Sequence, residues 1–257
     1  MNRARQLLQK IHDPKAPFVV GGHVFLTDPS ISEAFAFFGY DFIWIDGEHG
    51  PFDKEKILSH IVYAVEGGSA AFVRVYKNDA DVIKTILDMG VDGIIIPQIT
   101  TLAQAQSAIA SCLYPPKGIR GFGPRRANRF NALPLEAYIK EADSSFLRIL
   151  QIEHYKAVEI IDAIVDIAGL DSVMIGPMDL SSSMGLLGQP LHPKVLEMGK
   201  RVIRAAKKKG IACGVSIGPD RTFIKTWKDL GVDYISCGDD ISFLHKGAQQ
   251  TIKACRD

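Results

Sequence analysis

The sequence has no marked excess of charge and no long apolar run. Its 30 basic and 29 acidic residues give a net charge of +1 at pH 7. Such a balance produces no overall electrostatic field that would favour nucleic acid or a membrane surface. No apolar run approaches the roughly 18 residues that a membrane-spanning helix needs. We therefore expect neither nucleic acid nor a membrane among the partners of this protein.

Cysteine and metal-site motifs are also scarce. The four cysteines are Cys112, Cys213, Cys237 and Cys255, and no two of them form a CxxC pair. We interpret them as reduced, buried thiols of a cytoplasmic protein. The seven histidines show neither HxxxH nor HxH spacing, which argues against zinc held by protein ligands alone. The first residues, MNRARQLLQKI, read as an amphipathic helix without the apolar segment of a signal peptide.

Short apolar segments alternate with amphipathic segments along the chain. The apolar segments resemble strands of a buried parallel sheet, and several amphipathic segments end in glycine, as helices often do. The predicted strands are Phe18–Val24, Phe42–Ile45, Ala71–Val75, Gly93–Ile96, Leu147–Ile152, Ser172–Ile175, Ile211–Val215 and Tyr234–Cys237. The predicted helices are Ser30–Phe38, Lys54–Val65, Asp79–Met89, Leu102–Ser111, Tyr155–Ile167, Pro193–Lys209, Asp220–Leu230 and Ile241–Ala254.

Eight strand–helix units in 257 residues are typical of the (β/α)8 TIM barrel, an α/β fold. No Pro- or Ser-rich linker divides the chain, so we predict one domain over residues 1–257. A doubly wound open sheet is the alternative, but it would more often contain fewer strands or a nucleotide-binding loop. The segment Gly121–Gly123 is not such a loop, because it lacks a third glycine and follows no strand.

Polar residues collect at the carboxyl ends of the predicted strands, where TIM barrels place their function. In Phe42–His49, FIWIDGEH, an apolar strand leads into a turn with the ionisable residues Asp46, Glu48 and His49. The other strand ends carry His23, Thr27, Arg74, Gln98, Gln151, Glu153, Asp179, Ser216 and Asp239. This concentration predicts a catalytic rim at one end of the barrel.

Glu153 and Asp179 follow neighbouring predicted strands. Two converging carboxylates repel each other unless they share a cation or a proton. We therefore predict that they bind Mg²⁺ or Mn²⁺, which prefer oxygen ligands and leave positions for water and substrate. The alternative is that Glu153 caps the next helix and Asp179 stabilises a turn. His154 would point away from the barrel axis.

His49 is the best candidate for a general base, and Asp46 on the same turn is placed to fix its tautomer. Arg74 ends an apolar strand, where its burial would be costly without an anion. A guanidinium suits a carboxylate or an enolate oxygen. The alternatives are a turn histidine and an internal ion pair of Arg74 with Asp46 or Glu48.

The turn Gly176–Asp179 presents backbone N–H groups at Met178 and Asp179, which could hold a substrate carboxylate. One long excursion, residues 114–135, contains five cations but no ladder of aromatic residues, which argues against nucleic acid. We interpret it as a solvated loop or a subunit interface, with contact to an anionic substrate tail as the alternative.

The segments WIDGEH, VRV, LQIE and IGPMDLSSSMG, with YPPKGIRGFG between them, closely resemble the HpcH/HpaI family of metal-dependent class II pyruvate aldolases. The resemblance runs from about Phe18 to Cys237. It implies a barrel of the phosphoenolpyruvate/pyruvate type and reversible cleavage of a 4-hydroxy-2-oxo acid to pyruvate and an aldehyde. It also implies Mg²⁺ or Mn²⁺, with Co²⁺ as a further option, and a homo-oligomer, a hexamer built as a trimer of dimers that exchange the last helix.

By motif position, the resemblance makes Glu153 and Asp179 the metal ligands. His49 becomes the catalytic base paired with Asp46, and Arg74 binds the keto oxygen of pyruvate. The pyruvate moiety would be held by Gln151, Gly176, Met178 and Asp179. The chain departs from the family at His23, where tryptophan is common, and in PRRANRFN after Gly123.

Three alternatives to a metal-dependent aldolase would use the same strand ends: another lyase, another mechanism and a non-catalytic function. A citramalyl- or malyl-CoA-type lyase shares the paired acids, and the arginine-rich excursion would suit a CoA phosphate, but the DGEH turn favours the aldolase. A Schiff-base mechanism would need Lys77, which stands beyond Arg74. A non-catalytic barrel that binds pyruvate or oxalate would not need His49, Asp46, Arg74 and both acids.

Overall fold

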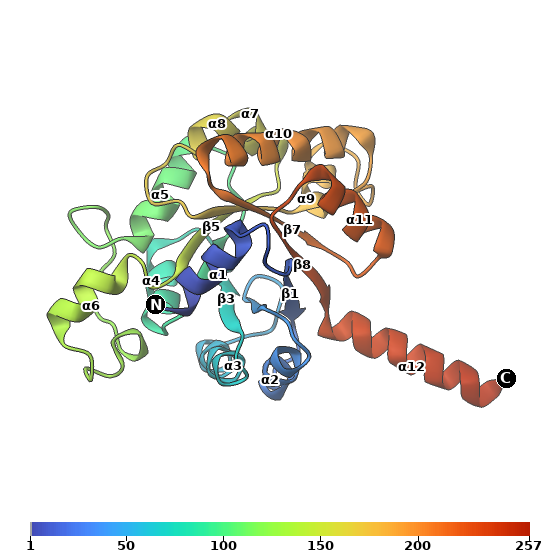
Figure 1. Cartoon of the computed structure of the whole chain (residues 1–257), viewed down its shortest axis with the longest axis horizontal. Coiled ribbons are helices and arrows are strands. Elements are labelled where there is room, and N and C mark those ends of the chain that lie inside the picture. The colour runs from blue at the N-terminus through green and yellow to red at the C-terminus, as the bar shows by residue number, and fades with distance from the viewer. Residues whose placement is uncertain (1) are drawn as a thin grey trace.

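The computed structural model describes residues 2–257 and has eight parallel strands in a closed barrel (Figure 1). Each strand pairs with the next in sequence, and β8 pairs with β1. The strands are β1 (Val19–Val24), β2 (Phe42–Asp46), β3 (Ala70–Arg74), β4 (Gly93–Ile96), β5 (Leu147–Ile152), β6 (Ser172–Ile175), β7 (Ala212–Ile217) and β8 (Tyr234–Asp239). The predicted (β/α)8 barrel is therefore confirmed.

Helices surround the barrel and close one of its ends. They are α1 (Arg3–His12), α2 (Ser30–Phe37), α3 (Lys54–Glu66), α4 (Ala80–Asp88), α5 (Leu102–Cys112), η1 (Arg126–Asn128), α6 (Leu135–Ala142), α7 (Tyr155–Glu159), α8 (Ile161–Ile164), α9 (Pro177–Ser183), α10 (Pro193–Lys209), α11 (Arg221–Leu230) and α12 (Asp240–Arg256). The predicted helix Tyr155–Ile167 is interrupted, because Ile160 leaves the helical conformation at φ −109°, ψ 17°. The short helices α6 and α9 were not predicted.

The barrel interior is filled by alternating large and small side chains, as is usual in this fold. The ring of Phe42 occupies the space beside Gly21, where an added Cβ would lie 2.2 Å from it. Tyr234 fills the space beside Gly214 in the same way, at 2.5 Å. The packing of the inner core therefore requires glycine at both positions.

Strand alternation and register together create a polar layer at the carboxyl end. Along β2, Phe42 and Trp44 point inward, so Asp46 also points inward at the end of the strand. Asp46 pairs in register with Arg74 at the end of β3. His23 of β1 lies in register with Trp44. Because alternate residues of each strand point into the barrel and the strands are in register, side chains from several strands lie in one polar layer.

The amino end of the barrel is closed by α1, whose Ala4 and Leu7 pack into the inner core. The arginine-rich excursion contacts this same end. Arg120 Nη2 bonds Asp88 at 2.8 Å, and Arg126 donates to the carbonyl oxygens that end α4. Arg120 and Arg126 therefore lie away from the carboxyl ends of the strands of their own chain, where the alternative interpretation, contact with an anionic substrate tail, would have placed them.

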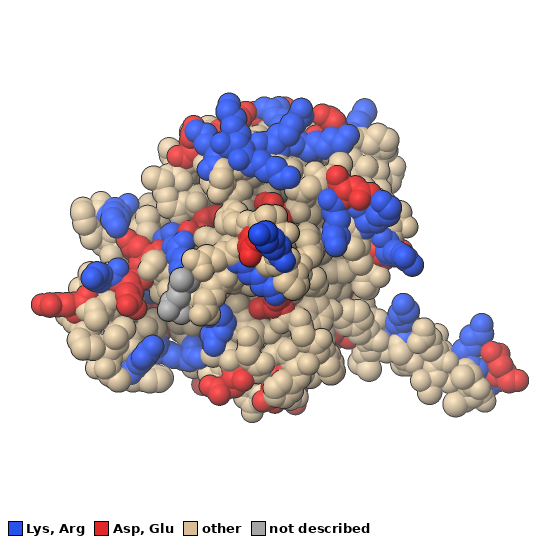
Figure 2. Space-filling view, in the orientation of Figure 1, with Lys and Arg blue, Asp and Glu red and all other residues tan. Residues whose placement is uncertain are grey.

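Helix α12 projects from the body of the molecule (Figure 1), and much of its surface carries neither acidic nor basic side chains (Figure 2). Ile241, Leu244 and Ile252 are exposed along it. Cys255 is also exposed, so the prediction of buried thiols is wrong there and holds for the other three cysteines. Among residues 2–257, no helix is both long and apolar enough to cross a membrane.

Candidate active site

Arg74 is buried between two carboxylates at the carboxyl end of the barrel. Its Nε lies 3.1 Å from Asp46 Oδ1, Nη2 contacts Asp46 Oδ2, and Nη1 lies 2.8 Å from Glu48 Oε2. Burial would raise the pKa of Asp46, but the hydrogen bonds and charge of Arg74 outweigh it and hold the pKa below its ordinary value. The internal ion pair considered from the sequence is therefore present.

The expected pairing of the His49 imidazole with Asp46 is wrong in this structure. Asp46 Oδ1 accepts the backbone N–H groups of Glu48, at 3.0 Å, and His49, at 3.1 Å. Its remaining capacity is used by Arg74. The sequence placed Asp46 and His49 on one turn correctly, but the strand register gives the carboxylate to Arg74. His49 itself is exposed and lines the cavity described below.

Glu153 is buried just beyond β5 and is held by two donors. Its Oε1 accepts the backbone N–H of Gln98 at 2.7 Å, and its Oε2 accepts Gln151 Nε2 at 2.6 Å. Burial raises the pKa of Glu153 to about 7, and the nearby charges of Asp179 and Glu48 act in the same direction. The alternative of a helix cap is wrong, because His154 caps α7 by accepting the N–H of Lys156.

Gln98 forms hydrogen bonds with both Glu48 and Glu153. It was not predicted as a site residue. Its Nε2 donates to Glu48 Oε1 at 2.8 Å while its backbone N–H serves Glu153. Gln98 has φ +59°, a left-handed conformation that is unusual for a residue other than glycine. Its place two residues after the end of β4 was the only signal in the sequence.

Gly176 and the first turn of α9 form the adjacent wall. An added Cβ on Gly176 would lie 3.0 Å from Gln151 Nε2 and 3.2 Å from Glu153 Oε2. The glycine therefore keeps this wall open beside the carboxylate. Met178 and Asp179 follow in the first turn of α9, where backbone N–H groups lack partners within the helix, and both side chains are exposed.

A cavity of about 490 Å³ collects part of the predicted site, but Asp46, Arg74, Gln151, Gly176 and Met178 are not among its lining residues. Glu48, His49, Gln98, Glu153 and Asp179 line it. Residues 2–257 contain no cluster of three His, Cys, Asp or Glu side chains arranged as metal ligands. Three carboxylates nevertheless line the cavity, those of Glu48, Glu153 and Asp179.

The donors around this cavity fit a hard divalent cation. The Oε1 atom of Gln151 is buried without a hydrogen-bond partner, and Glu153 is a carboxylate whose charge burial disfavours. A cation would relieve both conditions, with water or substrate supplying the remaining oxygen ligands.

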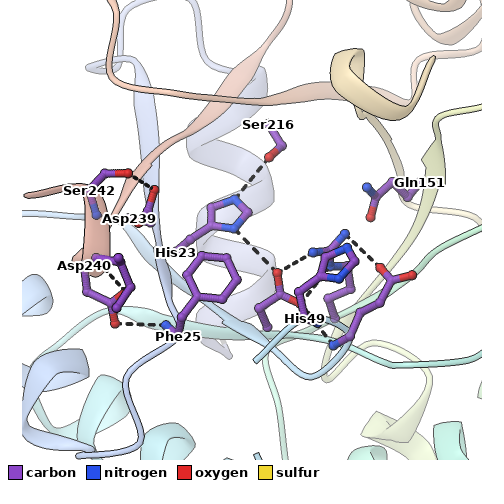
Figure 3. A network of polar contacts seen from close by, with 12 residues as sticks. His23, Phe25, His49, Gln151, Ser216, Asp239, Asp240 and Ser242 are labelled. Carbon is purple, nitrogen blue, oxygen red and sulfur yellow. Dashed lines mark hydrogen bonds and ion pairs between the residues drawn. The ribbon is translucent and has the colours of Figure 1, made fainter. Parts of the chain in front are cut away.

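His23 completes the polar layer; the sequence placed it at a strand end and as a departure from the family, but gave it no role in the site. Its Nε2 lies 3.1 Å from Ser216 Oγ, and its Nδ1 lies 4.0 Å from Asp46 Oδ2 (Figure 3). Its ring stacks on Trp44 with centroids 4.3 Å apart. The sequence placed both His23 and Ser216 at strand ends, but it could not show that they meet across the barrel.

Comparison with known proteins identifies the family to which this chain belongs. Residues 21–240 match the model of the HpcH/HpaI aldolase/citrate lyase family. A 5-keto-4-deoxy-D-glucarate aldolase from Salmonella arizonae is 33% identical over 88% of this chain and 87% of its own length. A hydroxypyruvate/pyruvate aldolase from Pseudomonas aeruginosa is 32% identical over 88% and 84%.

The crystal structure of an HpcH/HpaI aldolase from Desulfitobacterium hafniense superposes with a TM-score of 0.90 and 28% identity. The match covers 100% of this chain and 97% of that one. The chain therefore belongs to the HpcH/HpaI aldolase/citrate lyase family and is a carbon–carbon lyase.

Proposed function

We propose that the protein reversibly cleaves a 4-hydroxy-2-oxo acid to pyruvate and an aldehyde, as a class II aldolase. The observation that carries the proposal is the buried guanidinium of Arg74 beside a cavity lined by Glu153 and Asp179. A fixed cation next to two carboxylates suits a reaction in which negative charge develops on an oxygen. The two named aldolase relatives support the same reaction class.

The proposed cofactor is a divalent cation, Mg²⁺ or Mn²⁺, with Co²⁺ as a further option. Glu153 and Asp179 would hold it, because their carboxylates line one cavity and burial disfavours the charged form of Glu153. When bound, such an ion acts as a Lewis acid that polarises a 2-oxo acid and favours its enolate.

The residues of the chain supply binding and proton transfer. Arg74 donates hydrogen bonds to the keto oxygen, and Gln151, with the backbone of Met178 and Asp179 beside Gly176, holds the pyruvate moiety. His49 takes the proton from the 4-hydroxyl group. The C3–C4 bond then breaks, its electron pair forms the enolate of pyruvate, and the aldehyde leaves. Protonation at C3 completes pyruvate.

Exchange of the C3 protons of pyruvate in deuterated water tests this function directly. With Mn²⁺ present, the protein should exchange these protons without any aldehyde, because enolate formation is the shared step. EDTA should abolish the exchange, and borohydride with pyruvate should leave no covalent adduct on Lys77 or any other lysine. Binding of pyruvate or oxalate without exchange would instead identify a non-catalytic barrel.

We further propose that the protein is a homo-oligomer, a hexamer built from dimers that exchange α12. A groove of about 730 Å³, lined by Phe35, Phe38 and Tyr40 among others, lies beside the base of this helix. The exposed apolar side chains of α12 need a partner surface of this kind. The helix of a second copy would fill the groove.

Replacing Ile252 with glutamate should therefore weaken self-association. Ile252 is 43% exposed on the projecting helix, and placing a charge in an apolar interface should raise the dissociation constant about a hundredfold. Sedimentation velocity at several concentrations measures the change. Gln250→Glu adds the same charge on the opposite face of the helix and should leave the oligomer intact. Equal weakening by both variants would rule out this apolar face as the interface.

A further inference from the structure

Gln98 has no role in the proposed function, although it lies in the site. It lines the cavity together with three carboxylates, those of Glu48, Glu153 and Asp179. The proposed cation uses two of them, Glu153 and Asp179. A third carboxylate on the same octahedral ion would occupy a position that water or substrate needs. Substrate binding at this cation therefore requires that Glu48 is held elsewhere.

Both oxygens of Glu48 already have partners in the protein. Oε2 lies 2.8 Å from Arg74 Nη1, and Oε1 accepts a hydrogen bond from Gln98 Nε2 at 2.8 Å. Because a carboxylate only accepts hydrogen bonds, the amide of Gln98 presents its NH₂ group to Glu48. Among the described residues, no group of three His, Cys, Asp or Glu side chains is arranged as metal ligands. Glu48 thus lines the cavity without forming a ligand cluster with the other two acids.

The backbone holds Gln98 in the position that this contact requires. Its N–H donates to Glu153 Oε1 at 2.7 Å, and its φ of +59° lies in the left-handed region. The next residue, Ile99, is fully buried, and Thr101 then caps α5. A left-handed residue other than glycine persists only where the surrounding structure enforces it. One residue therefore holds two acids, Glu153 through its backbone and Glu48 through its side chain.

We propose that Gln98 is a positioning residue, which holds Glu48 on Arg74 and thereby keeps Glu48 Oε1 off the proposed cation. Two carboxylate ligands then leave open positions for the carboxylate and keto oxygens of the 2-oxo acid. This inference rests on the proposed function and adds to it a residue that sets how tightly the site binds substrate. Because the number of charged ligands tunes the affinity for such ions, release of Glu48 strengthens cation binding and weakens binding of an anionic substrate.

Gln98→Met tests this role, because it preserves the length of the side chain and the backbone N–H but removes the amide donor. Mn²⁺ binding is measured by electron paramagnetic resonance without substrate, and oxalate binding by calorimetry on the Mn²⁺-loaded protein. The dissociation constant of Mn²⁺ should fall about tenfold, and that of oxalate should rise about tenfold. A general loosening of the site would instead weaken the binding of both.

Two further variants separate the amide of Gln98 from its backbone and from Glu48. Asparagine adopts the left-handed region more readily than most residues, but its amide is one methylene shorter and does not reach Glu48. Gln98→Asn should therefore reproduce both changes. In a Glu48→Gln background, Gln98→Met should change neither constant relative to Glu48→Gln alone, because an amide oxygen is a weaker ligand than a carboxylate.

The expected result is opposite changes in the two dissociation constants, in both Gln98 variants and only while residue 48 is an acid. Any other pattern would overturn the inference, including weaker binding of both ligands, two unchanged constants, or the same changes in the Glu48→Gln background. A wild type that binds no Mn²⁺, or that does not exchange the C3 protons of pyruvate, would instead contradict the proposed function.

Discussion

Replacing Arg74 with methionine is expected to lower the rate of C3 proton exchange in pyruvate by a factor on the order of a thousand. The guanidinium is fixed by Asp46 and Glu48 before substrate arrives, so it stabilises developing negative charge without reorganisation, and removal of one such donor has effects of this size. The rate is measured by NMR in deuterated water with Mn²⁺. A loss of less than tenfold would remove Arg74 from the proposed mechanism.

The same variant should also lose stability, because the two carboxylates around Arg74 would remain without their cation. Breaking a buried pair by removing one partner costs about 3–5 kcal/mol of the free energy of unfolding. The double variant Asp46→Asn with Arg74→Met removes one of the stranded charges. It should recover part of the stability in urea unfolding but none of the exchange, which separates the role of Arg74 in catalysis from its role in folding.

Arg74→Lys gives an intermediate case. It keeps the positive charge but cannot bond both oxygens of Asp46 in the planar arrangement of a guanidinium. Its stability should exceed that of Arg74→Met, while its exchange rate should remain well below that of the wild type.

The barrel could be predicted from the sequence because its strands are apolar segments with local turn signals. Phe42–Ile45 and Gly93–Ile96, for example, were placed correctly within one residue. The predicted end of Phe42–Ile45 missed Asp46, which is polar but belongs to β2. The sequence alone favoured a turn for this residue, whereas pairing with Arg74 of β3 keeps it in the sheet.

The residues that line the cavity could be predicted in part, because barrels collect polar residues at the carboxyl ends of their strands. That rule correctly placed Glu48, His49, Glu153 and Asp179 around one cavity. The pairing among them was not predictable, because it depends on the register between strands. A partner three residues away in sequence, such as Asp46 for His49, competes with a partner 28 residues away, and here Arg74 binds the carboxylate.

Gln98 and the contact of His23 with Ser216 could not be derived from local patterns either. The first depends on a left-handed backbone conformation at a residue that rarely adopts it. The second joins residues 193 positions apart in the chain. This second contact results from closure of the barrel, which brings β1 next to β8 and only one strand away from β7.

Glu153→Gln should abolish exchange while leaving the fold intact. The substitution preserves the size of the side chain, and its carbonyl oxygen can still accept the N–H of Gln98. Its new amide N–H faces Gln151 Nε2, which donates to Glu153 Oε2 in the wild type, so the Gln151 amide must rotate by about 180° to accept this N–H through Oε1. A carbonyl oxygen is a much weaker ligand than a carboxylate for a divalent cation. We expect a loss on the order of a thousandfold in Mn²⁺-supported exchange.

Stability measured against pH would show that this loss comes from the charge of Glu153. Burial raises the pKa of Glu153 from 4.5 to about 7 in the folded protein. The native state therefore keeps a proton that the unfolded state releases, and the stability that this carboxyl group contributes falls as pH rises from about 4.5 to 7. Without metal, the wild type should become less stable than Glu153→Gln by about 3 kcal/mol at pH 8 relative to pH 4.

Taking the difference between the two proteins removes the contributions of other titrating groups. His23 and His60 have pKa values lowered to about 4 by burial, so they stabilise the fold as pH rises and act in the opposite direction. Both are present in both proteins and cancel. Mn²⁺ should then raise the stability of the wild type at pH 8 far more than that of Glu153→Gln, because a bound cation compensates the buried carboxylate. Equal stabilisation of both proteins by Mn²⁺ would place the metal elsewhere. If the difference in the free energy of unfolding between the two proteins does not change with pH, the pKa of Glu153 is not raised by burial.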